Sequence, residues 1–409
     1  MPLTRTVHGL ATLDAPGRTA AAVTAGPVDA APLDAHRLDA NPVDAERLRQ
    51  RVDGALTGFL DRRQATLEAI SPRLLPVAAT LRDFLLDGGK RLRPAFCYWG
   101  WRGAGGSADE EGAVVAAAAL ELLQAGALVH DDLIDRSDTR RGLPSVHRRF
   151  QALHAAGGWR GDGARYGEAG AVLLGDMLLM WSDELFGDCG LDRDAVRRAK
   201  PLFDLMRTEV MAGQYLDVLE PAACGDTPGD PGGGGPADAD PIERARTVVH
   251  YKSAKYTIER PLQIGGLLAG ADPALVAAYG AFGLPLGEAF QLRDDLLGVY
   301  GDPAVTGKPA GDDLREGKRT LLVAETLATC AGSDARLLDE LLGTPGLGAS
   351  EVAMLRSAIT RSGAPDRVEA RITALLHEAL TALDDAPILD PAARRVLHRL
   401  AAAATTRRY

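Results

Sequence analysis

A run of charged residues at positions 130–147, HDDLIDRSDTRRGLPSVH, contains four aspartates, three arginines and two histidines. Asp131 and Asp135 are four residues apart, so in a helix both carboxylates lie on one face, with Asp132 beside them. Like charges at this spacing repel each other, which a purely structural helix does not favour. Carboxylate oxygens, shared with substrate phosphates, are usual ligands of Mg²⁺. The run therefore indicates a Mg²⁺ site, and a solvated helix end is the alternative for this cluster taken alone.

A second acidic cluster lies far along the chain. The segment QLRDDLLGVYGD, residues 291–302, places Asp294 and Asp295 at the end of an Ala/Leu-rich segment, and GKPAGDDLREGKRT, residues 307–320, follows it. Two acidic helix faces could clamp a cluster of metal ions between them. Only a polyanionic ligand would make such a cluster stable, so the two segments together predict a site for one.

Basic residues that could match such a ligand occur in two places. The segment GGKRLRP, residues 88–94, sets Lys90 and Arg93 after a Gly-Gly pair, and Arg140 and Arg141 follow the first aspartates. Guanidinium groups bind phosphate oxygens bidentately, and lysine adds a point charge. Each pair alone would more often be surface charge. Together, in a chain of net charge −10, they indicate a local basic pocket.

Composition disfavours several other classes of protein. The net charge of −10 argues against nucleic acid as a partner, because a surface that binds nucleic acid needs clustered positive charge. The four cysteines contain no CxxC pair and indicate neither a zinc site nor a disulfide framework. Glu121 and Gln124 interrupt the most apolar run, 113–129, which falls short of the roughly 18–20 uncharged residues of a membrane span. The N-terminus has no apolar segment typical of a secretory signal. We therefore expect a cytoplasmic protein without a membrane span.

Helix-forming residues dominate the chain. Alanine and leucine make up most of the apolar residues and aromatic residues only 5 %, which favours an all-α fold. Leu48, Val52, Leu56 and Leu60 recur at four-residue spacing and form the apolar stripe of a first helix. Strand-like alternation is absent from the sequence. Further helical segments are expected near 111–130, 168–187, 195–219, 242–270, 274–298 and 318–329, and three more near 334–342, 350–361 and 364–383.

Two parts of the chain differ from this pattern. Residues 1–45 are rich in Ala, Pro and Asp and repeat a five-residue pattern that fits neither helix nor strand, so we expect a disordered tail. Residues 46–409 are expected to form one all-α domain. Within it, GGWRGDGARYG at 157–167 and the Gly/Pro-rich insertion at 224–241 are expected to be loops, the second of them mobile.

Six motifs carry a family resemblance. GGKRLRP, DDLIDRSDTRRG, GQYLD, YKSAKYT, QLRDDLLGVYGD and GKPAGDDLREGK are similar, in this order, to the signatures of the trans-isoprenyl diphosphate synthases, the polyprenyl synthetase family. Six ordered matches over roughly residues 50–409 are far more specific than a single DDxxD. The resemblance implies an all-α bundle around a deep apolar central cavity, usually a homodimer. It also implies Mg²⁺-dependent head-to-tail condensation of isopentenyl diphosphate with an allylic diphosphate.

The resemblance further implies roles for individual side chains. Asp131, Asp135 and Asp294 would ligate about three Mg²⁺ ions per active site, with Asp132 in support. No side-chain nucleophile is needed, because the alkene attacks an allylic carbocation that is shielded from water. The other implied residues are Arg140, Lys252 and Lys308 for the allylic diphosphate, Lys90, Arg93, Gln124 and Arg141 for isopentenyl diphosphate, and Ser253, Gln214, Asp217 and Gln291 near the developing cation.

Two positions depart from the family pattern. The second aspartate motif usually ends in a third aspartate, but Gly298 occupies that position, and the sequence leaves open whether Asp302 compensates. Ser253 stands where a threonine is usual and keeps the hydroxyl. We therefore expect an active enzyme whose second metal site is altered.

Product length depends in this family on the residues before the first aspartates. Ala127 and Gly126 lie four and five residues before Asp131, about one helical turn deeper. In the family, bulky aromatics there stop growth at farnesyl diphosphate, so two small residues with Leu123 a turn below suit geranylgeranyl diphosphate (C20). Farnesyl or longer products are the alternatives, and the two small residues could instead serve only close helix packing. Further bulk could come from a neighbouring helix that contains Met177, Leu178, Met180 and Trp181.

Two other classes of protein share some of these features. A class I terpene cyclase also ionises an allylic diphosphate, but it needs no second diphosphate site such as Lys90, Arg93 and Arg141 would form. The chain also shows no Asn/Asp…Ser/Thr…Glu metal triad of the kind that such cyclases use. A non-catalytic partner subunit would be expected to lose the first aspartates or the basic pairs, and both are present. The sequence therefore favours an active synthase.

Overall fold

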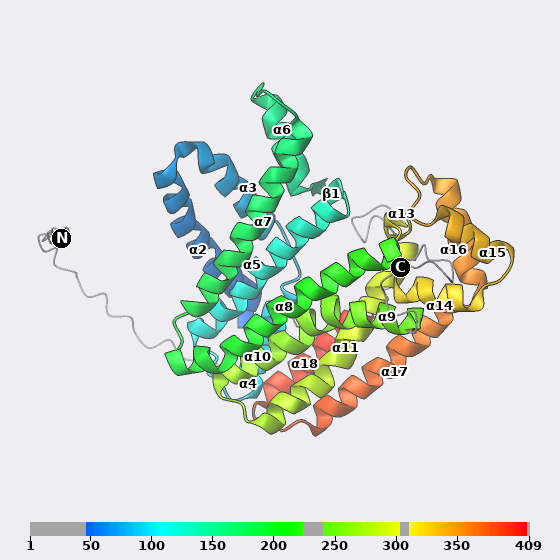
Figure 1. The fold of residues 1–409 in the computed structure, drawn as a ribbon. Coiled ribbons are helices and arrows are strands. Elements are labelled where there is room, and N and C mark those ends of the chain that lie inside the picture. The colour runs from blue at the N-terminus through cyan, green and yellow to red at the C-terminus, as the bar shows by residue number, and fades with distance from the viewer. Residues whose placement is uncertain (1–45, 224–239, 303–310, 407–409) are drawn as a thin grey trace, which may run out of the picture.

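The computed structural model describes residues 46–223, 240–302 and 311–406. The tail predicted at 1–45 and most of the insertion predicted at 224–241 lie outside the described residues. Within the described ranges the chain is a bundle of helices, so the predicted all-α class is confirmed (Figure 1).

The helices follow one another with short connections. Up to the insertion, the elements are α2 (Leu48–Ile70), the 3₁₀ helix η2 (Pro72–Leu74), α3 (Leu75–Leu86), α4 (Leu92–Gly103), α5 (Glu111–Ile134), β1 (Thr139–Arg140), β2 (Leu143–Pro144), α6 (Val146–Ala156), α7 (Gly163–Gly187) and α8 (Arg193–Ala223). After it come α9 (Pro241–Val248), the π-helical segment η3 (Val249–Glu259), α10 (Arg260–Ala269), α11 (Pro273–Tyr300), α13 (Asp312–Glu316), α14 (Leu321–Thr329), α15 (Ser333–Leu341), α16 (Ala349–Arg361), α17 (Ala364–Asp385) and α18 (Pro391–Thr405).

Two local features differ from the predictions. The loop predicted at 157–167 is shorter, because Asp162 accepts hydrogen bonds from the backbone N of Ala164 (2.8 Å) and Arg165 (3.5 Å) and so caps α7. The two strands form an antiparallel hairpin that the sequence pattern did not predict. Its turn residues Arg141 and Gly142 both have positive φ, 55° and 75°, as a two-residue hairpin turn requires. Such short strands leave no alternating pattern in the sequence.

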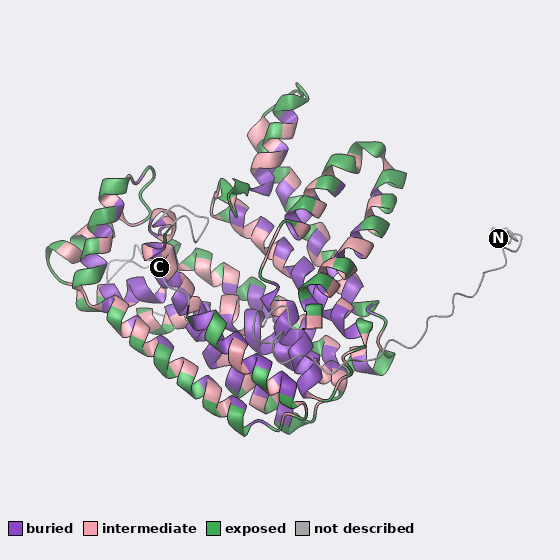
Figure 2. Ribbon diagram, turned by 180° about the vertical axis from the view of Figure 1, so that it is seen from behind, coloured by how far each residue is buried: buried purple, intermediate pink, exposed green. Residues whose placement is uncertain are grey.

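A first hydrophobic core surrounds α5. Leu48, Val52, Leu56 and Leu60 of α2 are all buried against it, as predicted. Figure 2 shows the buried residues concentrated in the middle of the bundle. By length and hydropathy α5 could cross a membrane, but 78 % of its most apolar window is buried, as in the central helix of a folded core.

A second hydrophobic core lies at the C-terminal end of α11. Leu292 and Leu296 of that helix pack there with residues of α14, α16 and α17. The N-terminal half of α11, which includes Phe282 and Leu286, belongs to the first core. Because α11 joins the two cores, the acidic motif near its C-terminus is held rigidly relative to α5.

Candidate active site

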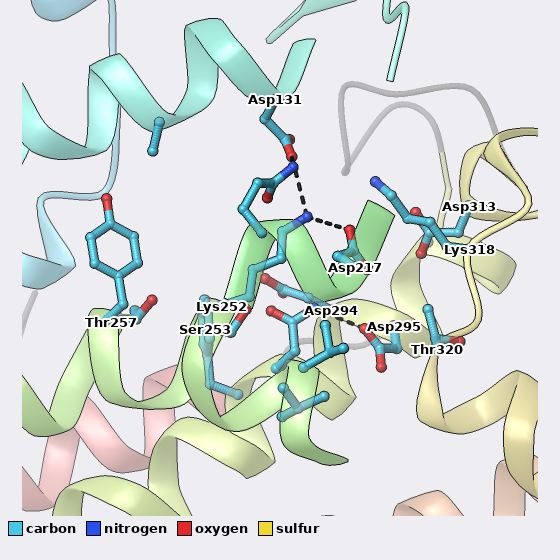
Figure 3. A pocket seen from close by; sticks show the side chains of 18 of the residues that line it. Asp131, Asp217, Lys252, Ser253, Thr257, Asp294, Asp295, Asp313, Lys318 and Thr320 are labelled. Carbon is cyan, nitrogen blue, oxygen red and sulfur yellow. Dashed lines mark hydrogen bonds and ion pairs between the residues drawn. The ribbon is translucent and has the colours of Figure 1, made fainter. Parts of the chain in front are cut away.

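A cavity of about 690 Å³ is lined by side chains from α4, α5, β1, α8, α9, η3, α11 and α13 and from the segments next to them. Figure 3 shows Lys252 of η3 pointing toward Asp131 of α5 and Asp217 of α8. The predicted site residues that line the cavity are Lys90, Arg93, Gln124, Asp131, Arg140, Gln214, Asp217, Lys252, Ser253, Gln291 and Asp294, together with Ala127.

Three other predicted residues are not among those that line the cavity. Asp132 is fully buried and accepts a hydrogen bond from Arg140 Nε at 2.8 Å, so it positions that guanidinium. Asp135 pairs with Lys318 Nζ at 2.8 Å. Arg141 is directed toward the end of α3, where its Nη1 donates to Asp87 O at 3.4 Å. The remaining predicted residue, Lys308, lies outside the described residues.

The first aspartate motif is surrounded by cations. Asp131 accepts from Lys252 Nζ at 3.2 Å, from Gln214 Nε2 at 3.2 Å and from Arg140 Nη2 at 3.4 Å. Burial alone would raise the pKa of Asp131, but Lys252, Lys318 and Arg140 hold it well below its ordinary value. This carboxylate is therefore ionised at any physiological pH.

The second aspartate motif has the opposite balance. Asp295 is deeply buried, and burial together with Asp313 and Asp294 raises its pKa to about 8, although Gln291 Nε2 donates to its Oδ1 at 2.8 Å. Its Oδ2 has no hydrogen-bond partner within the described part of the chain. An unpaired, buried carboxyl oxygen beside other acids favours the arrival of a cation.

The position of the missing third aspartate is filled from another element. A Cβ at Gly298 would lie 1.9 Å from Asp313 Oδ2, so Gly298 leaves room for the Asp313 carboxylate, which lines the cavity. Asp302 follows the end of α11 and does not line the cavity. The acid that accompanies Asp294 is therefore Asp313 of α13.

Several residues of the site received no role from the sequence. Lys318 lies between the two motifs, where it pairs with Asp135 and with Glu316 at 2.6 Å. Its presence in the run GDDLREGK, as one of only six lysines, was the available signal. Tyr256 and Thr257 follow Lys252 by about one turn of η3, and only the helix period could have indicated that they share its face.

The basic side of the cavity is organised by Tyr256. The guanidinium of Arg93 lies 4.2 Å from the Tyr256 ring centroid, and its Nη2 donates to Thr257 Oγ1 at 2.7 Å. The Tyr256 hydroxyl donates to Gln124 Oε1 at 2.6 Å. These contacts fix Arg93 and Gln124 on the side of the cavity that also contains Lys90.

The carboxylates fit Mg²⁺ only if a ligand shares the ions. Among the described residues, no three His, Cys, Asp or Glu side chains come together as a preformed metal cage. Mg²⁺ typically binds one or two carboxylates and completes its octahedron with water and substrate phosphates. Asp131 on α5 and Asp135 at its C-terminal end, with Asp294 and Asp295 on α11, match that donor set.

The two small residues proposed to set product length lie in different surroundings. Ala127 lines the cavity, but a Cβ at Gly126 would lie 3.0 Å from Gly175 O and 2.9 Å from Leu179 Cδ2 of α7. Gly126 therefore permits close packing of α5 and α7, and Leu123 is buried in the first core, away from the cavity lining. Ala127 therefore lies on the cavity side of α5, whereas Gly126 and Leu123 do not line the cavity. The two neighbours differ because adjacent helix positions are about 100° apart.

The residues of α7 that could have added bulk to the cavity point elsewhere. Met180 is 63 % exposed, and the Trp181 ring packs edge-on against Phe59 of α2 at 5.8 Å. Leu178 is fully buried, and Met177 packs against the first core. Of the described residues that line the cavity, none belongs to α7.

A helical bundle in which facing carboxylates and cations enclose one cavity is typical of enzymes that bind a diphosphate with metal ions. The chain belongs to the polyprenyl synthetase family, whose model matches residues 76–359, and it is a prenyltransferase. It is 31 % identical over 316 residues to the geranylfarnesyl diphosphate synthase of Aeropyrum pernix, covering 76 % of this chain and 88 % of that one.

Two further similarities are to enzymes named as geranylgeranyl diphosphate synthases. The geranylgeranyl diphosphate synthase of Saccharolobus solfataricus is 32 % identical over 258 residues, which is 63 % of this chain and 68 % of that one. The structure of geranylgeranyl pyrophosphate synthase from Corynebacterium glutamicum, complexed with isoprenyl diphosphate and magnesium, superposes with a TM-score of 0.82 at 40 % identity. That comparison covers 88 % of this chain and 99 % of the other.

Proposed function

We propose that the protein condenses isopentenyl diphosphate head-to-tail with an allylic diphosphate and releases geranylgeranyl diphosphate. The observation that carries this proposal is the division of one cavity into an acidic part between α5 and α11 and a separate basic part around Arg93. Two diphosphates can occupy such a cavity at once, one with metal ions and one without. Membership of the polyprenyl synthetase family supports the same reaction.

The allylic diphosphate would occupy the acidic part. Bound Mg²⁺, held by Asp131, Asp135 and Asp294, would supply positive charge to the leaving diphosphate, with about three ions expected. Lys252 and Arg140, already aligned by hydrogen bonds, would bind its oxygens directly. Because these groups are fixed before the substrate arrives, little reorganisation accompanies the departure of the diphosphate.

Isopentenyl diphosphate would occupy the basic part. Lys90 and Arg93 would bind its phosphates, and Gln124, held by Tyr256, would orient it. The hydroxyl of Ser253 and the amide of Gln291, which line the cavity, would lie near the reacting carbons. The apolar lining excludes water from the allylic cation, and the departing diphosphate can accept the proton that is released.

The C20 product is supported by Ala127, the small residue on the cavity side of α5. Ala127→Phe is expected to shift the product toward farnesyl diphosphate, whereas Ala127→Ser, of similar size, should leave it unchanged. Gly126→Phe should lower the melting temperature, because its ring would collide with Gly175 and Leu179. An active Ala127→Phe enzyme with unchanged product would contradict this assignment.

We also propose a homodimer in the cytoplasm. Apolar side chains on two long helices are exposed in the single chain, which favours burial against a second copy. The most exposed are Leu173 and Met180 of α7 and Tyr215 of α8, at 66 %, 63 % and 68 %. Light scattering on the purified protein should give twice the chain mass, and Tyr215→Glu should shift it toward the monomer.

Product chromatography tests the reaction itself. The purified chain is supplied with Mg²⁺, isopentenyl diphosphate and, in turn, dimethylallyl, geranyl or farnesyl diphosphate, and geranylgeranyl diphosphate is expected from each. A class I terpene cyclase would instead release diphosphate from the allylic substrate alone and form a hydrocarbon. A non-catalytic partner subunit would release none, and farnesyl or longer products would overturn only the assigned length.

A further inference from the structure

Arg91, within the GGKRLRP motif, has a side chain that is only 3 % exposed. Its Nε donates to Asp53 Oδ1 at 2.9 Å, its Nη1 to Glu121 Oε2 at 2.8 Å and its Nη2 to Leu85 O at 2.7 Å. These three contacts connect the motif to α2, to α5 and to the end of α3. The guanidinium is thus engaged inside the protein, and Arg91 is not among the described residues that line the cavity.

The backbone of this segment is unusual. Gly88, Gly89 and Arg91 all have positive φ, 94°, 108° and 49°. Glycine adopts this region freely, but an arginine there is unfavourable and must be held by its surroundings. The side-chain contacts of Arg91 provide that hold. They fix the irregular segment between α3 and α4 from which Lys90 projects.

A second arginine packs against the same segment. Arg141 Nη2 and Arg91 Nη1 would each lie 3.3 Å from a Cβ at Gly89, so the two guanidiniums share the space beside this glycine. Burial and the nearby charges of Arg91 and Arg140 lower the pKa of Arg141, and the carboxylate of Glu121 raises it. Glu121 is 6 % exposed, so its charge acts through a poorly screened medium.

We propose that Arg91 and Glu121 form a positioning pair for the second diphosphate site. Arg91 fixes the backbone that presents Lys90, and Glu121 offsets the repulsion between Arg91 and Arg141, so that both arginines can remain at one site. The inference rests on the proposed function, in which Lys90, Arg93 and Arg141 bind isopentenyl diphosphate. Neither member of the pair belongs to the described lining of the cavity, so both act through other residues.

Steady-state kinetics with each substrate varied separately test the pair. Glu121→Gln keeps the size of the side chain and removes its charge, and Arg91→Met removes the anchor. Each is expected to raise KM for isopentenyl diphosphate about tenfold and KM for the allylic diphosphate less than about twofold. Arg91→Lys keeps the charge but loses the multiple hydrogen bonds of the guanidinium, so its KM for isopentenyl diphosphate should lie between those of the wild type and Arg91→Met. The double variant should be no worse than the more affected single variant, because the two residues act together.

A buried ion pair at the other end of α4 provides the matched control. Arg102 pairs with Asp390 at 2.7 Å, away from the cavity, so Arg102→Met should lower the melting temperature without changing the ratio of the two KM values. If the Arg91 and Glu121 variants behave like Arg102→Met, the pair is structural only and the proposal is wrong.

Binding measurements separate this proposal from the proposed function. Calorimetric titration of isopentenyl diphosphate alone into Glu121→Gln should give a Kd about tenfold higher than for the wild type, and an unchanged Kd would overturn the inference. This variant also carries the test if Arg91→Met cannot be purified. A wild-type enzyme that neither binds nor consumes isopentenyl diphosphate would overturn the proposed function instead.

Discussion

The two aspartate motifs place the same residue type in opposite electrostatic settings. Asp131 of the first motif is surrounded by Lys252 and Arg140, and its pKa lies well below the ordinary value. Asp295 of the second motif is buried beside other acids, among them Asp313, and its pKa is raised to about 8. Fixed cations of the protein dominate at Asp131, whereas burial and neighbouring acids dominate at Asp295. A metal ion would therefore offset more unfavourable charge at Asp295 than at Asp131.

The largest expected effect comes from the first motif. Asp131→Ala removes the carboxylate that orients Lys252 and Arg140 and would bind metal, so kcat should fall at least about 100-fold. Diphosphate release at saturating substrates measures this. Asp138→Ala is the matched control, because Asp138 belongs to the same run but pairs with Arg148 on the surface at 2.7 Å. Equal activity of the two variants would contradict the metal assignment.

Glu288 extends the comparison, because it lies on α11 with Asp295 but has basic partners. Burial alone would raise the pKa of Glu288, but His250, Arg371 and Arg246 lower it to about 2, below the ordinary 4.5. A depressed carboxyl pKa stabilises the fold above about pH 4.5, and this stability is lost as the pH falls toward about 2. At pH 7 it amounts to at most about 3 kcal/mol.

Urea unfolding of Glu288→Gln checks this expectation. The variant should have a lower free energy of unfolding than the wild type at pH 7, and the difference should shrink between about pH 5 and pH 2. Glu378→Gln changes an exposed glutamate of α17 and should show no such dependence. A difference that stays constant with pH would mean that Glu288 acts through packing alone.

Gly298→Asp tests whether the second motif can be restored to the family pattern. The added side chain would collide with Asp313, so we expect a loss of about 1–3 kcal/mol in stability and no gain in activity. Asp313→Gly in the same chain should relieve the collision and recover most of the melting temperature. An active, stable Gly298→Asp single variant would show that Asp313 does not occupy this position.

The smallest expected effect concerns the basic part of the cavity. Arg93→Ala should raise KM for isopentenyl diphosphate about tenfold, because it removes the guanidinium, held over Tyr256, that would bind the phosphates. KM for the allylic substrate should change little. Arg82→Ala, which removes a half-buried arginine of α3 that pairs with Asp61 and does not line the cavity, is the control. A rise confined to the allylic substrate would reverse the assignment of the two parts.

Much of the fold could be predicted from composition and helix periodicity. The stripe from Leu48 to Leu60 is buried as its spacing indicated, and the helices after the insertion begin and end close to the predicted residues. The start of α7 was missed, because glycines around Asp162 concealed a capping residue. The predicted closing segments also omitted α18, whose short Ala-rich pattern follows Pro391.

The motifs of the site could be predicted from the sequence, but the direction in which each side chain points could not. Motif order identified many of the polar and charged residues that line the cavity, because the motifs bring these side chains to facing parts of neighbouring helices. The rotation of α5 about its axis is a tertiary property, so Ala127 and Gly126 could not be separated by counting from Asp131. Asp313 reaches Gly298 only because α13 packs against α11. This tertiary contact could not be predicted from the spacing of the two residues in the sequence.

The π-helical segment η3 has a consequence for how this enzyme can change over evolution. Lys252, Ser253, Tyr256 and Thr257 all reach the cavity from one short stretch whose backbone bonds skip one more residue than in an α-helix. Loss of a single residue there would let the segment relax to an α-helix and turn its two halves relative to each other by about 100°. A substitution in η3 can change one side chain at a time, whereas an insertion or deletion would reorient several cavity residues at once. The number of residues in this segment therefore determines activity as much as their identity does.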